Sequence, residues 1–124
     1  MNKLIILKLI SIKKCMLKIV DLFCGPGGLS TGLEMAGFQS ICALDNNKNA
    51  VETYSNNHHC NANVVDLLHF DVEKLPNCDI LVGGPPCVQF SSAKTNKTRN
   101  VLAGLLLVQI FLKAVLVKKP KYWI

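Results

Sequence analysis

Apolar runs that end in turn residues recur along this chain and predict strands alternating with helices. The apolar run at residues 17–23 is followed by a glycine-rich stretch at residues 24–28, which predicts a strand and then a tight turn. Residues 29–36 place apolar side chains at helical spacing, and Gly37 is suited to end that helix because glycine readily adopts a left-handed conformation. The domain is therefore expected to begin with a strand, a glycine turn and a helix.

The same alternation continues to the last residue. Further strands are predicted at residues 39–44, 63–67, 78–82 and 122–124, and further helices at residues 49–57 and 101–117. Strands that alternate with helices in this way form a parallel sheet, so the pattern predicts an α/β fold with a doubly wound sheet. Because the chain stops inside a predicted strand, we interpret it as truncated.

A length of 124 residues leaves room for one domain. Residues 16–124 carry the strand–helix pattern, whereas residues 1–15 are rich in Lys, Ile and Leu and contain neither an acidic nor a turn residue. We interpret residues 1–15 either as an extension of unknown use or as untranslated, with synthesis starting at Met16; the second interpretation is favoured.

The composition excludes a disordered chain, and the distribution of charge indicates one class of partner. Half of the residues are hydrophobic, 18% are charged and the mean hydropathy is +0.31. The net charge of +6 is unevenly spread: residues 1–18 carry +5, residues 19–93 carry −6 and residues 94–124 carry +7. An acidic middle between two basic ends suits a polyanion that approaches one edge of the molecule.

The six cysteines do not form a metal-binding pattern. No Cys-x-x-Cys pair occurs, and the adjacent His58, His59 and Cys60 have poor geometry for sharing one ion, so no metal site is predicted. The apolar residues 4–12 are interrupted by Lys8 and lead to no small-residue cleavage site, which argues against a signal peptide. Reduced thiols and a cytoplasmic location are therefore expected.

Residues 101–117 are the other candidate for a membrane segment. They are 17 residues long, at the short end for a membrane span, and contain Gln109 and Lys113. A helix buried against the sheet is the favoured interpretation, so no membrane partner is expected.

Three features are predicted to lie at the carboxyl ends of the strands, where open parallel sheets bind ligands. The glycine turn at residues 24–28 allows a ligand to approach the backbone, although a tight turn without a ligand has the same sequence. Asp45 ends the second predicted strand and suits either the two hydroxyls of a ribose or the cap of the next helix. Cys87 follows the rigid pair Pro85-Pro86 and is interpreted as a nucleophile or as a small buried side chain.

Taken together, these residues resemble the cytosine-5 DNA methyltransferases. Residues 21–28, Asp-Leu-Phe-Cys-Gly-Pro-Gly-Gly, are similar to motif I of that family, and Pro86-Cys87 within residues 83–91 is similar to motif IV. Asp45 and Asp66 stand where motifs II and III of the family carry carboxylates. The resemblance extends from Lys18 to the end of the chain, and it implies a Rossmann-like fold of the S-adenosylmethionine-dependent methyltransferases.

The resemblance implies transfer of a methyl group from S-adenosylmethionine to carbon 5 of cytosine in DNA, as in restriction–modification systems. Cys87 would be the catalytic nucleophile: its thiolate adds to carbon 6 of the base and activates carbon 5. The implied partner is a DNA duplex whose target cytosine is flipped out of the base stack.

The resemblance also implies a set of cofactor contacts. Phe23 would pack beside the adenosine, Asp45 would hold the ribose, Asp66 would contact the adenine, and the glycine turn would surround the methionine portion. The implied cofactor-binding residues are Phe23, Cys24, Gly25, Gly27, Gly28, Asp45, Asn46, Asp66 and Pro85.

Three residues depart from the family pattern. Cys24 stands where the family often has alanine, and Asn46 stands where many members have a bulky residue. Val88 replaces the glutamine that usually follows the Pro-Cys pair, with Gln89 one place later. These departures concern contacts to the substrate and the cofactor more than the nucleophile itself.

The family's Glu-Asn-Val motif, its target-recognition region and its C-terminal helix have no counterpart within these 124 residues. We therefore expect the chain alone to be nearly inactive and to need a complementing C-terminal chain. Two other functions stay open: methylation of tRNA by an enzyme of the same fold, and a non-catalytic remnant that binds S-adenosylmethionine.

Overall fold

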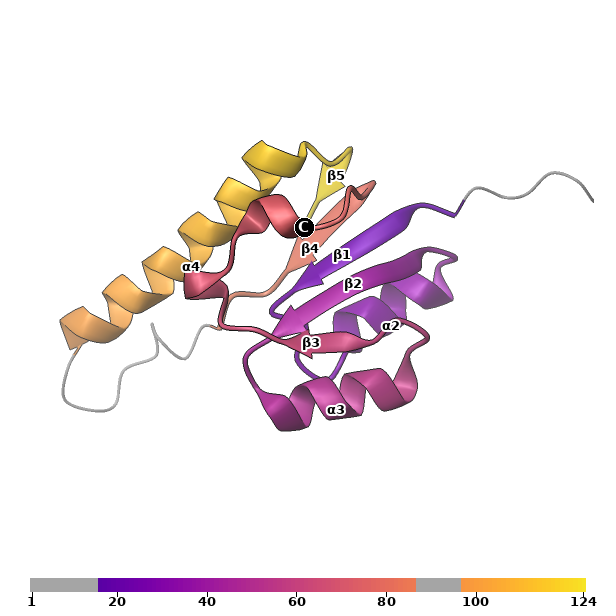
Figure 1. Ribbon diagram of the computed structural model, residues 1–124, viewed down its shortest axis with the longest axis horizontal. Helices are drawn as coiled ribbons and strands as arrows, with labels where there is room; N and C mark the ends of the chain where they lie inside the picture. The colour runs from indigo at the N-terminus through magenta and orange to yellow at the C-terminus, as the bar shows by residue number, and fades with distance from the viewer. Residues whose placement is uncertain (1–15, 87–96) are drawn as a thin grey trace, which may run out of the picture.

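Five strands pair in parallel in the order β3-β2-β1-β4-β5 in the computed structural model, which describes residues 16–86 and 97–124 (Figure 1). The strands are β1 (Lys18–Leu22), β2 (Gln39–Asp45), β3 (Ala62–Val64), β4 (Ile80–Gly83) and β5 (Tyr122–Trp123). The helices are α2 (Gly28–Met35), α3 (Lys48–Asn57) and α4 (Lys97–Lys118), with short 3₁₀ turns η1 (Leu67–His69) and η2 (Val72–Lys74). This order confirms the predicted doubly wound α/β fold, with β1 at the point where the strand order reverses.

The segment after β3 differs from the prediction. The strand expected at residues 63–67 ends at Val64, and η1 begins three residues later. The side chains of Asp66 and Asp71 each accept a backbone N–H two residues further on, which favours capped turns over an extended strand. The apolar side chains after β3 therefore pack from 3₁₀ turns rather than from a longer strand.

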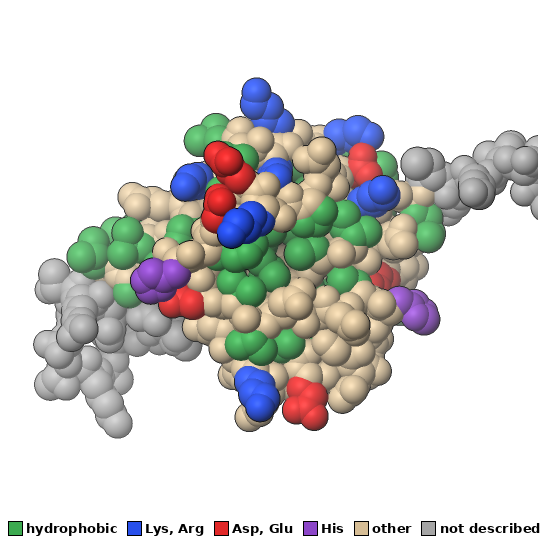
Figure 2. Space-filling model, viewed as in Figure 1, with side chains coloured by type: hydrophobic (Ala, Val, Ile, Leu, Met, Phe, Trp, Pro, Cys, Tyr) green, Lys and Arg blue, Asp and Glu red, His purple; other side chains and the backbone are tan. Residues whose placement is uncertain are grey.

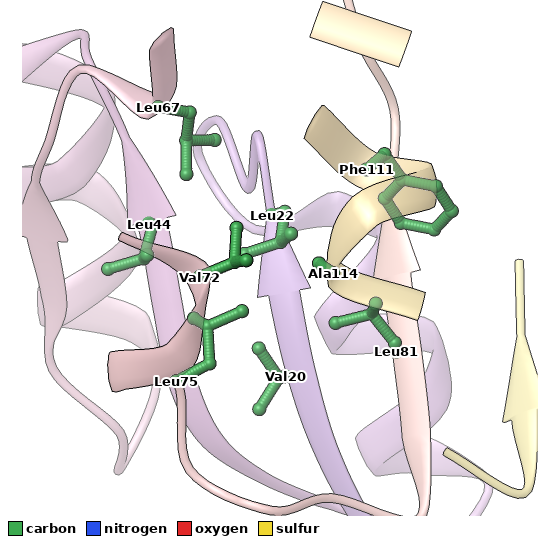
Figure 3. Packing of buried hydrophobic residues seen from close by; sticks show 9 residues of the cluster. All are labelled: Val20, Leu22, Leu44, Leu67, Val72, Leu75, Leu81, Phe111 and Ala114. Carbon is green, nitrogen blue, oxygen red and sulfur yellow. The ribbon is translucent and has the colours of Figure 1, made fainter. Parts of the chain in front are cut away.

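The main core lies between the sheet and α4 (Figure 1). Alternate residues of β1 point to opposite faces: Val20 and Leu22 belong to this core, whereas Ile19 packs on the other face. Figure 3 shows the core side chains gathered between the strands, the 3₁₀ turns and α4: Val20, Leu22, Leu44, Leu67, Val72, Leu75, Leu81, Phe111 and Ala114. All nine are at most 6% exposed.

Only one narrow side of α4 is buried, so the prediction of a helix buried against the sheet is right in part. Gly104, Phe111 and Ala114 are buried, but they are the buried 17% of the 18 residues Val101–Lys118. By length and composition this helix is also apolar enough to cross a membrane. The exposed apolar residues of α4 are Val101, Leu102, Leu105, Leu106, Val108, Leu112, Leu116 and Val117. Figure 2 shows hydrophobic side chains at the surface along the side on which α4 lies.

Candidate functional site

A cavity of about 370 Å³ lies where β1, β2 and β4 end. Its volume is within the range of small-molecule sites, and its position is the one at which open parallel sheets bind ligands. The cavity is lined by Phe23, Gly25, Pro26, Asp45, Asn46, Asn47, Ala50, Val65, Asp66, Leu67, Gly84, Pro86 and Leu107. Five of the nine predicted cofactor-binding residues are in this list: Phe23, Gly25, Asp45, Asn46 and Asp66.

The glycine turn joins β1 to α2 through two left-handed residues. Gly25 has a φ of +53° and Gly27 a φ of +102°, a region in which residues with a Cβ are strained. Gly27 is the N-cap of α2 and provides no side-chain hydrogen bond to the first turn of that helix. The helix therefore begins without a side-chain cap, and its positive dipole end favours an anionic group.

Phe23 is held in an unusual conformation at the end of β1. Its φ of +60° is one of two positive values among the non-glycine residues that the structure describes. Such a conformation costs roughly 1–3 kcal/mol and persists only where the surroundings enforce it. The next residue, Cys24, donates its N–H to the carbonyl of Leu44 at 3.0 Å, which ties the chain to β2 directly after this residue. Strain at a cavity-lining aromatic residue favours a functional role.

Asp45 links the end of β2 to the glycine turn. Its Oδ2 accepts the N–H of Gly25 at 2.9 Å, and its Oδ1 accepts the N–H of Asn47 at 2.8 Å. The N-cap of α3 is Asn47, whose Oδ1 accepts the N–H groups of Asn49 and Ala50. The helix-cap interpretation of Asp45 is therefore wrong. Each carboxylate oxygen keeps a further lone pair for a ligand.

Asp66 contributes a second carboxylate to the cavity lining. Its Oδ1 accepts the N–H of Leu68 at 3.0 Å, and its Oδ2 lies 2.8 Å from Nδ1 of His69. The hydrogen bond from His69, followed by that from Leu68, lowers the pKa of this carboxyl below its usual value. Two carboxylates and two asparagines thus line the cavity together with apolar residues such as Phe23, Val65 and Leu107. This lining suits a ligand that has both a flat apolar part and hydroxyl groups.

The other predicted residues lie beside the cavity or outside the described residues. Cys24 is buried against Ala43, Val51 and Tyr54, and burial raises the pKa of its thiol to about 12. Gly27 is the N-cap of α2 and Gly28 its first residue, and Pro85 stands between the lining residues Gly84 and Pro86 in the sequence. Cys87 follows Pro86 in the sequence and lies outside the described residues.

Several lining residues were not predicted from the sequence. Asn47 was detectable because asparagine is a strong N-cap residue and a helical pattern follows it. Leu107 comes from α4, in which apolar residues occur on every side, so no local pattern distinguishes it from its neighbours. Among residues 16–86 and 97–124, no group of three or more His, Cys, Asp or Glu side chains could hold a metal ion.

Comparisons with known proteins point to one family. The sequence profile described as C-5 cytosine-specific DNA methylase matches residues 17–124. Type II methyltransferase M.FnuDI of Fusobacterium nucleatum is 34% identical over 108 residues, which cover 87% of this chain and 31% of that protein. Type II methyltransferase M.HgiGI of Herpetosiphon aurantiacus is 37% identical over 110 residues. This match covers 86% of this chain and 86% of that protein.

A solved structure shares the fold. A protein encoded within an E. coli prophage and described as a DNA modification methyltransferase superposes with a TM-score of 0.68 at 28% identity, over 84% of this chain and 30% of that one. The chain thus spans about a third of the length of M.FnuDI and of this structure.

Proposed function

The chain belongs to the C-5 cytosine-specific DNA methylase family, and we propose that it forms the cofactor-binding part of an enzyme that methylates carbon 5 of cytosine in DNA. The observation that carries the proposal is the cavity at the ends of β1, β2 and β4. The Asp45 carboxylate and the glycine turn lie on one side of it, and Pro86, the residue before Cys87, also lines it.

The residues of this cavity fit S-adenosylmethionine. Asp45 retains lone pairs for the two ribose hydroxyls, and Asp66 offers an acceptor to the adenine amino group. Phe23, Val65 and Leu107 supply apolar surface for the adenine ring. The uncapped start of α2 suits the carboxylate of the methionine portion. The bound cofactor would supply the electrophilic methyl group.

Cys87 is proposed as the nucleophile. Its thiolate would form a bond from Sγ to carbon 6 of cytosine, which places an electron pair on carbon 5. Carbon 5 would take up the methyl group from the bound cofactor, and the electrons of the broken carbon–sulfur bond would stay on the cofactor's sulfur. A base would then remove the proton from carbon 5, and the bond from Sγ to carbon 6 would break and release the thiolate. The target base must leave the duplex for this contact, so base flipping belongs to the proposal.

The described cysteines are poorly suited to that role. Burial is the largest cause that raises the thiol pKa of Cys24, Cys42, Cys60 and Cys78 above the ordinary value. A raised pKa leaves little thiolate at neutral pH, and the thiolate is the reactive form. Of Cys15 and Cys87, which lie outside the described residues, Cys87 directly follows the cavity-lining Pro86, and this position supports it as the nucleophile.

Repeated methylation of DNA is proposed to need further residues besides these 124. Because the chain matches about a third of M.FnuDI, the general acid and the base-reading surface would come from a further segment or from a complementing C-terminal chain. DNA is the proposed substrate.

The nucleophile is tested by trapping. Mixed with a C-terminal part of a relative such as M.FnuDI and with S-adenosylmethionine, the chain should form a denaturation-resistant adduct with DNA that contains 5-fluorocytosine. Cys87→Ser should abolish the adduct, because a hydroxyl is far less nucleophilic than a thiolate. The matched control Cys60→Ser, away from the cavity, should retain it. Gel electrophoresis gives the readout; an adduct that survives Cys87→Ser, or no adduct with the unaltered chain, would contradict the assignment.

Cofactor binding is tested on the chain alone by calorimetry. Asp45→Ala removes hydrogen bonds from a charged acceptor and should weaken the affinity for S-adenosylmethionine by roughly tenfold to a hundredfold. Asp45→Asn, which keeps one acceptor oxygen, should fall between this variant and the unaltered chain. Glu52→Ala, on an exposed part of α3, serves as the control. If Asp45→Ala binds as well as the unaltered chain, Asp45 is not part of the site.

A further inference from the structure

We propose that His58 is a positioning residue: from the end of α3 it supports the glycine turn at Gly27 and thereby sets the affinity of the cavity for S-adenosylmethionine. The inference rests on the proposed function of the cavity. His58 itself is not among the residues that line that cavity, so it would act through the turn.

The imidazole of His58 is buried and is held on three sides. Its side chain is 1% exposed. Nδ1 lies 2.8 Å from Oε2 of Glu34, and Nε2 lies 3.3 Å from Oγ1 of Thr31. The ring stacks on Tyr54 with 4.1 Å between the ring centroids and an interplanar angle of 23°. A carboxylate only accepts hydrogen bonds, so Nδ1 carries a hydrogen and Nε2 faces Thr31.

The Nε2 edge of the ring packs directly against Gly27. A Cβ added at Gly27 would lie 2.3 Å from Nε2 of His58, so the imidazole occupies the space that any other residue would need there. Thr31 connects the two residues a second time, because its hydroxyl donates to the carbonyl of Gly27 at 2.9 Å while it also contacts Nε2. Gly27 is thus fixed by a contact at its Cα and by a hydrogen bond at its carbonyl.

The conformation of Gly27 decides how α2 begins. With a φ of +102°, Gly27 turns the chain from the cavity-lining residues Gly25 and Pro26 into the first turn of α2. If the ring of His58 were shorter or absent, a gap would open behind Gly27 and the turn could relax into it. The N–H groups at the start of α2 would then lose the fixed orientation that the contact between His58 and Gly27 gives them.

Two amide substitutions separate positioning from general stabilisation. In His58→Asn the amide nitrogen takes the place of Nδ1, which keeps a bond to Glu34 but leaves the space behind Gly27 empty. In His58→Gln the longer side chain reaches the place of Nε2 and fills that space. Both variants lose the ring stacking on Tyr54, so both should be somewhat less stable to heat.

The readouts are the affinity for S-adenosylmethionine, measured by calorimetry, and the amide resonances of Gly27 and Gly28 in nitrogen–proton correlation spectra. His58→Asn should weaken binding about tenfold, the low end of the losses known for orienting residues at metal sites. Its glycine resonances should shift. In His58→Gln the affinity and the resonances should return close to those of the unaltered chain. His59→Asn, at the exposed neighbouring position, should change neither.

The outcomes distinguish the two proposals. If the unaltered chain does not bind S-adenosylmethionine, the proposed function of the cavity fails and this inference fails with it. If the unaltered chain binds and both His58 variants bind equally well, or are weakened equally, the cavity keeps its function and the positioning role is refuted. Should His58→Asn not fold, Thr31→Val decides the matter, because it removes the hydroxyl link at nearly constant volume; an unchanged affinity in Thr31→Val would then overturn the inference.

Discussion

Gly27→Ala should be among the most damaging single substitutions in this chain, with an expected loss of roughly 2–5 kcal/mol in the free energy of unfolding. Two causes add up. A φ of +102° is strained for a residue with a Cβ, and the new methyl group would lie 2.3 Å from Nε2 of His58 and 2.9 Å from Cδ2 of Tyr54. Neither neighbour can move away easily, because the His58 side chain is 1% exposed and Tyr54 is fully buried. Denaturant unfolding followed by circular dichroism measures the loss.

The neighbouring glycine provides the control for this prediction. A Cβ at Gly28 meets nothing within 4 Å, and Gly28 is already the first residue of α2. Gly28→Ala should therefore leave the stability unchanged or raise it slightly, since alanine is the better helix former. In a double-substitution cycle, His58→Ala should recover part of the loss caused by Gly27→Ala, because it removes the clash but not the backbone strain. Full stability of Gly27→Ala would contradict the left-handed conformation of Gly27.

The regular part of the fold was predictable because its signals are local. An apolar run followed by a glycine turn identified β1 and α2, and the second run ending at Asp45 identified β2. These signals depend only on residues that are close together in the sequence. Glycine permits a positive φ, and a buried parallel strand needs consecutive apolar side chains. The alternation of strands and helices predicted the parallel, doubly wound sheet, whereas the order of its strands was not predicted.

Features that depend on tertiary contacts were harder to predict. The sequence of α4 is apolar on every side, so it does not reveal that Phe111 and Ala114 are buried while Leu116 is 74% exposed. The length of β3 was overestimated because Val65 and Leu67 suit either a strand or a 3₁₀ turn, and the hydrogen bonds of Asp66 favour the turn.

In the candidate site, too, local features were predictable and tertiary contacts were not. Asp45 was detectable as an acidic residue at the end of a strand, but its bond to the N–H of Gly25 depends on two strands being neighbours. His58 drew attention only as a possible metal ligand beside His59 and Cys60. Its contact with Gly27 joins the end of α3 to the start of α2, and no pattern in either segment encodes it.

Asp21 is expected to make the chain less stable as the pH rises through about 6. Its side chain lies in β1 beneath the start of α2, and the residue is 1% exposed. Ser30 donates to Oδ2 of Asp21 at 2.6 Å, and Tyr54 donates to Ser30 at 3.0 Å. Burial, the largest cause, raises the pKa of Asp21 from 3.8 to about 6, although the bond from Ser30 acts in the opposite direction. The folded chain therefore holds this proton more tightly than the unfolded chain does.

The sign of the pH dependence follows from that difference. The stabilisation is complete below about pH 4, where Asp21 is protonated in both states, and it is lost as the pH rises through about 6. The difference between a pKa of 3.8 in the unfolded chain and about 6 in the folded chain corresponds to roughly 3 kcal/mol. Asp21→Asn keeps an acceptor for the Ser30 hydroxyl and cannot ionise, so it should be more stable than the unaltered chain at pH 8 by up to that amount, with no such gain at pH 4. Urea unfolding at pH 4, 6 and 8 measures both curves, with the exposed Glu52→Gln as the control. A decline between pH 4 and pH 8 that persists unchanged in Asp21→Asn would show that another group is responsible.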